Sequence, residues 1–109
     1  MWFIFPQIAG LGLTRMSRFF ALGGREDAYA YLAHPLLGPR LLESSRALLA
    51  VEGRTANQIF ASPDDLKLCS SATLFATISE ADSLFHRILV HYFDGAVDGR
   101  TLALLERQA

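Results

Sequence analysis

The chain has 109 residues, of which 51% are hydrophobic and 19% are charged, and its formal net charge is −1. This length and composition predict one folded domain with a real core, and they exclude an intrinsically disordered chain. The near-neutral charge argues against a surface that follows nucleic-acid phosphates, so no nucleic-acid partner is expected. The single cysteine, Cys69, excludes an internal disulfide framework and a zinc site built from several cysteines.

The first thirteen residues are apolar apart from one glutamine and contain no charged side chain. Phe5 precedes Pro6, which disfavours helix, so residues 2–5 are predicted to be extended. Gly10 with Gly12 then allows a tight turn. It is shorter than the roughly 20 apolar residues that span a bilayer, and it lacks the basic start of a signal peptide. The chain is therefore expected to be cytoplasmic, with no membrane span.

The remaining sequence shows helical periodicity and no alternation typical of strands. It predicts an all-α fold, in which residues 1–109 form a compact single-domain bundle of six to seven short helices. Residues 36–38 are predicted to be a connector, and Pro39 is expected in the first turn of the next helix. The expected helices cover approximately residues 14–22, 25–32, 39–52, 55–60, 62–78, 79–94 and 99–107.

Three local patterns predict where helices begin. Thr55 and Gln58 have the spacing of a capping box. Residues 62–65 place a serine before a proline and two acids, which predicts that Ser62 is an N-cap. Ser79 with Asp82 is predicted to cap the following helix.

Several familiar chemistries are absent from the sequence. The glycines at positions 10 and 12 resemble a dinucleotide-binding turn, but Arg15 stands where the third glycine should be and no βαβ unit follows. His86 and His91 are five residues apart, which is the wrong spacing for two metal ligands on one helix face. Cys69 lies about two turns into its helix, which favours a small core residue over a reactive thiol. No metal and no cofactor are therefore expected.

A few polar residues remain as candidates. Lys67 is the only lysine, and with Asp65 and Ser70 it could bind an anion or activate a hydroxyl, or it could simply belong to a solvated helix start. His34 precedes a proline at a helix end, where an imidazolium would interact favourably with the helix dipole. Gln7 could satisfy the glycine turn or line a pocket.

Six motifs spread over nearly the whole chain resemble the bacterial DUF1810 family of unknown function, whose members are often labelled "calpastatin". The motifs are Trp2-Phe3-Ile4-Phe5-Pro6-Gln7, Gly10-Leu11-Gly12, Tyr31-Leu32-Ala33-His34-Pro35, Leu37-Gly38-Pro39-Arg40-Leu41, Ser62-Pro63-Asp64-Asp65-Leu66-Lys67 and Ser70-Ser71-Ala72-Thr73-Leu74-Phe75. The resemblance implies an all-α cytoplasmic domain without an established activity. The calpastatin label is expected to be an error, because calpastatins are long disordered inhibitors.

The resemblance also implies a difference at the front of the chain. Members of the family carry a further helical segment of some thirty residues before the tryptophan motif, so we expect a truncation or a mis-assigned start at Met1. Loss of a packed helix would uncover apolar surface, at a cost of about 25 cal/mol per Å².

Three functions remain open from the sequence. The first is a binding or interaction domain whose polar site gathers candidates from the shared motifs. The second is an enzyme or binder for a small anionic or nucleotide-like ligand, with Lys67 and Arg40 as anion contacts and Asp65 or His34 as base. The third is a self-associating protein that covers its apolar N-terminal segment. The candidate ligand-binding residues are Gln7, His34, Arg40, Asp65, Lys67 and Ser70.

Overall fold

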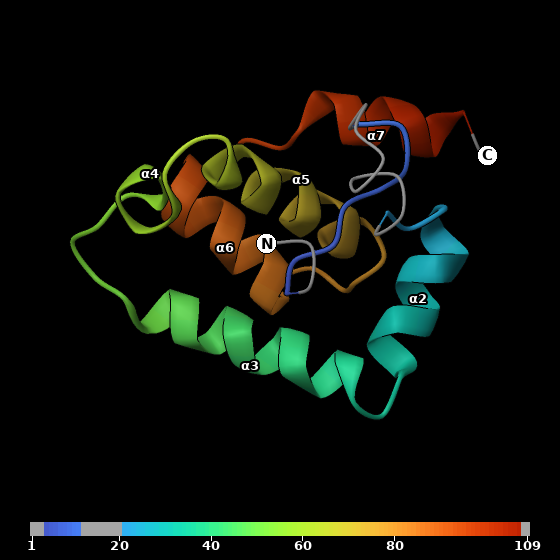
Figure 1. Ribbon diagram of the computed structural model, residues 1–109, viewed down its shortest axis with the longest axis horizontal. Helices are drawn as coiled ribbons and strands as arrows, with labels where there is room; N and C mark the ends of the chain where they lie inside the picture. The colour runs from blue at the N-terminus through green and yellow to red at the C-terminus, as the bar shows by residue number, and fades with distance from the viewer. Residues whose placement is uncertain (1–3, 12–20, 108–109) are drawn as a thin grey trace.

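A computed structural model describes residues 4–11 and 21–107 of the chain (Figure 1). Its elements in this part are α2 Arg25–Ala33, α3 Leu37–Ala50, α4 Ala56–Phe60, α5 Asp64–Thr77, α6 Leu84–Phe93 and α7 Gly99–Glu106. An isolated bridge between Ile8 and Leu22 is the only β-type pairing among these residues. The all-α single-domain prediction is confirmed. No helix in the described part is long and apolar enough to cross a membrane.

Helix α5 lies at the centre of the bundle (Figure 1). It packs against α2, α4, α6 and α7, while α3 packs against α2 and α6. The ring of Phe75 is fully buried, and its centroid lies 5.8 Å from that of Tyr31 on α2 and 5.2 Å from that of Phe85 on α6. This aromatic contact joins three helices, so α5 positions most other elements.

Residues 4–11 form a non-helical segment that crosses the bundle and ends beside α7 (Figure 1). The Phe5 ring lies 6.4 Å from the Phe60 ring of α4, and Ile8 is 1% exposed. Leu22 pairs with the segment: its N–H donates to the Gln7 carbonyl at 2.8 Å, and its carbonyl accepts from Ala9 at 2.7 Å. The predicted turn at Gly10 is confirmed, but Ile4 and Phe5 lie in a turn and a bend and not in the predicted extended conformation. Phe5, Pro6 and Ile8 are buried in the core.

The predicted helix over residues 14–22 falls largely outside the described residues. Its described end is not helical, because Leu22 pairs with the N-terminal segment instead. The prediction that this helix extends to Leu22 is therefore wrong.

The start of α3 differs from its prediction. The helix begins at Leu37, so two residues of the predicted connector are helical and Pro39 is the third residue of the first turn. The reason is His34, whose Nδ1 accepts hydrogen bonds from the N–H groups of Leu36 and Leu37, each at 3.1 Å. These bonds satisfy donors that would otherwise be unpaired at the helix start.

Of the three predicted helix starts, one is confirmed. Thr55 and Gln58 form the complete capping box of α4. Ser62 does not cap α5: the helix begins at Asp64, after a turn closed by a bond from Asp65 N–H to the Ala61 carbonyl at 3.0 Å. Because that turn places Ser62 outside the first helical turn, its hydroxyl makes no capping bond.

The predicted cap of α6 by Ser79 and Asp82 is also wrong. The hydroxyl of Ser79 donates back to the Phe75 carbonyl at 2.7 Å, so this residue, two positions beyond α5, bonds to the last turn of that helix. Asp82 has a φ of 69° and lies in the intervening turn. The N-cap is Ser83, whose Oγ accepts from the backbone N–H of His86.

The hydroxyl groups of α5 show one exception to a common pattern. Ser71 Oγ is buried without a hydrogen-bond partner among the described residues, and the residue is 1% exposed. The other four hydroxyl side chains in this region each donate to the carbonyl four residues earlier: Ser70, Thr73, Thr77 and Ser79.

Replacing Ser71 with alanine is expected to raise the free energy of unfolding by up to about 1 kcal/mol. The substitution removes a buried hydroxyl whose desolvation is not compensated, and alanine favours helix. Ser45→Ala is the matched control, because Ser45 is equally buried but donates to the Leu41 carbonyl at 2.8 Å. In urea unfolding, the free energy of unfolding of Ser71→Ala should exceed that of Ser45→Ala by about 1 kcal/mol. The reverse ranking would contradict an uncompensated hydroxyl at position 71.

Candidate functional site

Two of the candidate residues share the first turns of α5. The carboxylate of Asp65 accepts from the Asn57 side-chain amide at 3.2 Å and from the Leu66 N–H at 2.9 Å. The Nζ atom of Lys67 lies 3.4 Å from the Asp64 carboxylate. Asp65 therefore ties α5 to α4, and Lys67 forms an i, i+3 ion pair on the same helix.

Ser70 belongs to a separate polar network between α5 and α7. Its hydroxyl lies 3.1 Å from the Leu66 carbonyl and 3.2 Å from Asp98 Oδ2. Asp98 is the N-cap of α7, where Oδ2 also accepts from the backbone N–H and the hydroxyl of Thr101. Its own N–H donates to Thr73 Oγ1 at 2.9 Å. The sequence reading missed Asp98, because its partners on α5 are about 25 residues away along the chain.

Cys69 lies beside this network and is partly buried. Burial raises the pKa of the Cys69 thiol above its ordinary value of 9.0, and the nearby Asp98 charge raises this pKa further, against a lowering by the Thr73 hydroxyl. A raised pKa favours the unreactive thiol. The predicted core position is met only in part, because Cys69 packs against the core while remaining partly exposed.

His34 has a role other than the one predicted. It follows the last residue of α2, but its Nδ1 acts as a hydrogen-bond acceptor for Leu36 and Leu37. An imidazolium has no acceptor nitrogen, so these contacts require the neutral ring. The predicted imidazolium at the end of α2 is therefore wrong, and His34 instead caps the start of α3.

The six candidate residues do not meet at one place. Asp65 lies where α5 meets α4, whereas Phe75, ten residues farther along α5, contacts Tyr31 in the last turn of α2. At a rise of about 1.5 Å per residue, these two points are about 15 Å apart. His34 follows α2 directly, Arg40 is exposed in the first turns of α3, and Gln7 is in the N-terminal segment. Asp65 and Lys67 thus lie at the same end of α5, although side chains two positions apart on a helix do not face each other, and His34 and Arg40 lie toward the other end of the bundle.

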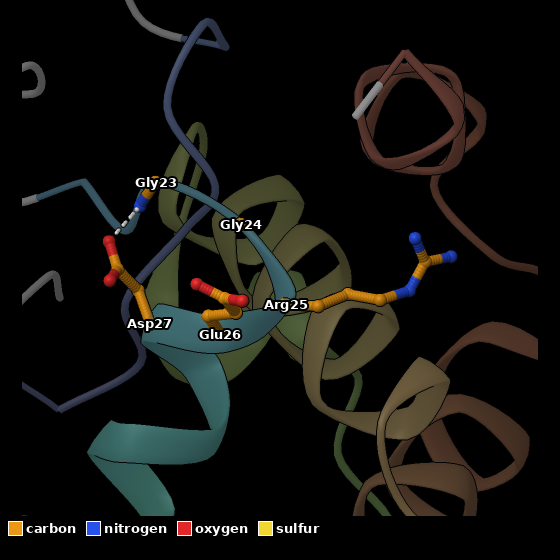
Figure 2. A pocket seen from close by; sticks show the side chains of 5 residues that line it. All are labelled: Gly23, Gly24, Arg25, Glu26 and Asp27. Atoms are coloured by element: carbon orange, nitrogen blue, oxygen red, sulfur yellow. Dashed lines mark hydrogen bonds between the residues drawn. The ribbon is translucent and has the colours of Figure 1, made fainter. Parts of the chain in front are cut away.

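A hollow of about 380 Å³ lies at the start of α2 (Figure 2). The Asp27 carboxylate accepts from the Gly23 N–H at 2.7 Å, and the Glu26 carboxylate lies on the same side. Arg25 extends away toward α7 and donates to the Leu105 carbonyl at 3.3 Å. A helix N-terminus ordinarily favours anions. Here two carboxylates already occupy that position, so the hollow does not suit an anionic ligand.

A second hollow, of about 460 Å³, lies between α3 and α6, and we call it the α3–α6 groove. Two histidines of α6 line it, and each is held by one ring nitrogen. His86 Nδ1 lies 2.7 Å from Ser83 Oγ, and His91 Nε2 lies 3.1 Å from the Val51 carbonyl at the end of α3. The described residues that line the groove are Leu49, Asp82, His86, Arg87, Val90 and His91.

The sequence reading considered these histidines only as metal ligands. Among the described residues, no group of three or more histidine, cysteine, aspartate or glutamate side chains is arranged to hold a metal ion. The sequence feature that could have indicated the groove was residue spacing. Positions 86 and 90, and positions 87 and 91, are i, i+4 neighbours on the polar side of α6. Only the packing of α3 against α6 turns that strip into a concave surface.

Two comparisons with known proteins find similar proteins whose function is not established. The model of the family described as "Protein of unknown function (DUF1810)" matches residues 1–105. The crystal structure of the conserved hypothetical protein Rv1873 from Mycobacterium tuberculosis is similar, with a TM-score of 0.93 and 48% sequence identity. The match covers 96% of this chain and 75% of that one. No curated protein matches.

Proposed function

This chain belongs to the DUF1810 family of proteins of unknown function, and we propose that it is a small-molecule-binding domain that acts by binding rather than by transforming its ligand. The observation that carries the proposal is that the candidate polar side chains stabilise helix ends and contacts between helices. His34 caps α3, Asp65 links α5 to α4, and Ser70 contacts the N-cap of α7. These three side chains therefore have structural roles.

Covalent chemistry would need a nucleophile beside a base, at about 2.6–3.2 Å, with the base free to accept a proton. Ser70 does lie 3.2 Å from a carboxylate oxygen, but that oxygen already accepts two hydrogen bonds from Thr101. Ser70 is also 7% exposed, so a substrate has little access to its hydroxyl. This arrangement supports a structural role for the pair.

An anionic or nucleotide-like ligand at the start of α5 is the alternative site. Lys67 and its partner Asp64 have side chains that are 24% and 40% exposed. Such an exposed pair contributes about 0–1 kcal/mol, so a ligand anion could replace Asp64 at small cost. In this alternative Lys67 is the principal contact, and Asp65 would have to reach the ligand from another face of the helix. Gln7, His34, Arg40 and Ser70 would then need to reach the ligand through its other parts.

Thermal unfolding in the presence of single metabolites tests the proposal. A ligand at 100 times its dissociation constant should raise the free energy of unfolding by about 2.7 kcal/mol. If Lys67→Gln removes the shift, the ligand lies at the start of α5; if the shift persists, it lies elsewhere. Conversion of a stabilising compound into a product would contradict the proposal, and so would the absence of any stabilising compound.

Self-association through the N-terminal segment is a less favoured candidate, because Phe5 and Ile8 are buried within the single chain while Ile4 is 48% exposed. An upstream segment of the kind expected from the resemblance would find Ile4 available as a contact. Light scattering at micromolar concentration distinguishes these cases: a dimer supports self-association, and a monomer contradicts it. A cytoplasmic location is part of the same proposal.

A further inference from the structure

The α3–α6 groove has a lining with mixed chemistry that none of the sequence motifs identified. Its volume of about 460 Å³ lies within the range of about 300–1,000 Å³ that small-molecule sites occupy. Its apolar contribution comes from Leu49 and from Val90, which is 66% exposed. An apolar side chain left this exposed on a helix beside oriented polar groups is a suitable contact for a ligand.

Each histidine of the groove is anchored through one ring nitrogen. The Ser83 Oγ accepts from the His86 backbone N–H and lies 2.7 Å from His86 Nδ1, a contact that either ring tautomer satisfies. The Val51 carbonyl can only accept, so His91 Nε2 is the donor of that contact. The tautomer of His86 in which Nδ1 accepts from Ser83 has Nε2–H as a donor, and the neutral ring of His91 has Nδ1 as an acceptor.

The two charged residues of the groove repeat this pairing of donor and acceptor. Arg87 Nη2 and Asp82 Oδ2 are 3.4 Å apart, and their side chains are 57% and 80% exposed. A pair this exposed contributes little to stability, so a ligand that carries both charges can replace each partner. The groove then presents two donor groups, two acceptor groups and an apolar surface, with no net charge.

We propose that the α3–α6 groove binds a free α-amino acid with an apolar side chain, in its zwitterionic form. Its carboxylate pairs with Arg87 and with the Nε2–H of His86, and its ammonium pairs with Asp82 and with Nδ1 of His91. Its side chain lies on Leu49 and Val90. The inference rests on the proposed function, since it names one site and one ligand class for a binding domain.

Histidine ring signals in nuclear magnetic resonance spectra provide the test, because the chain has three histidines. Titration with leucine should shift the signals of His86 and His91 saturably. The signal of His34 should stay fixed, because that ring lies at the α2–α3 corner. Three analogues remove one feature each: 4-methylpentanoate lacks the ammonium, 3-methylbutylamine lacks the carboxylate and alanine lacks the apolar surface. Each should bind about ten-fold more weakly than leucine.

Substitutions at the exposed charges provide the second arm. Arg87→Gln and Asp82→Asn should each weaken leucine binding about ten-fold, while Arg46→Gln, a change on the exposed side of α3, should leave it unchanged. Equal binding of 4-methylpentanoate and leucine would overturn the zwitterion in favour of a simple anion site. Unmoved His86 and His91 signals at tens of millimolar leucine would overturn the site itself. If another compound then stabilises the chain, the proposed function survives without this inference; if none does, both fail.

Discussion

Replacing Gly38 with alanine is expected to destabilise the chain by about 3 kcal/mol. A Cβ atom at this position would lie 2.0 Å from the Leu32 carbonyl oxygen and 2.9 Å from its carbon. Both atoms belong to the backbone of α2, so no side-chain rotation relieves the overlap and the α2–α3 corner must open. Thermal unfolding followed by circular dichroism should show a midpoint lower by roughly 10–20 °C.

Gly99→Ala is the matched control for this substitution. Gly99 is also a helical glycine, at the first position of α7, but nothing lies within 4 Å of a Cβ atom built there. Its replacement should stabilise the chain by about 0.5–1 kcal/mol, because alanine reduces the entropy of the unfolded chain. Effects of the same sign at the two positions would contradict the close approach of α2 and α3.

Replacing Asp98 with alanine is expected to cost about 3 kcal/mol. The change removes the N-cap of α7, worth about 1 kcal/mol, and leaves the fully buried Thr101 hydroxyl without its acceptor, worth about 1–3 kcal/mol. Asp98→Asn keeps a side-chain oxygen and should cost less. Glu80→Ala, an exposed change outside the network, should be close to neutral. Urea unfolding measures all three.

The same residue can be tested by a measurement that does not depend on stability. The Asp98 charge contributes to the raised pKa of the Cys69 thiol, after burial as the larger cause. Removing the charge in Asp98→Asn should lower this pKa, so the rate of Cys69 alkylation should begin to rise at a lower pH than in the unsubstituted chain. An unchanged pH profile would contradict electrostatic contact between these two side chains.

Local sequence signals predicted the helices well because those helices are set by short-range patterns. The capping box of Thr55 and Gln58 uses groups three residues apart, and both of its bonds are present. The start of α3 was missed because it depends on the His34 side chain, for which no common capping pattern exists. The start of α5 was missed because backbone bonds set the preceding turn, whereas the expected serine makes no capping bond.

The candidate site was harder to predict than the helices. Motif membership selected Asp65, Lys67 and Ser70, but Asp65 bonds to Asn57, Lys67 pairs with Asp64, and Ser70 contacts Asp98. His86 and His91 can also bind a ligand, but the helical periodicity of the sequence shows them only as polar residues on the solvent-facing side of α6. The orientation of these rings is set by Ser83 and by Val51 at the end of α3. It depends on how the helices pack, which the sequence pattern does not show.

The N-terminal segment at residues 4–11 also has a consequence for how the chain folds. Arg100 donates to the Leu11 carbonyl, and the side chain of Leu104 packs close to Gly10, so these contacts join residues about 90 positions apart. Closing a loop of that length costs the most chain entropy. Contacts between helices that are neighbours in sequence, such as α5 and α6, close shorter loops and cost less entropy to form. We therefore expect the segment to cross the bundle late in folding. Weakening it should accelerate unfolding while leaving the folding rate nearly unchanged.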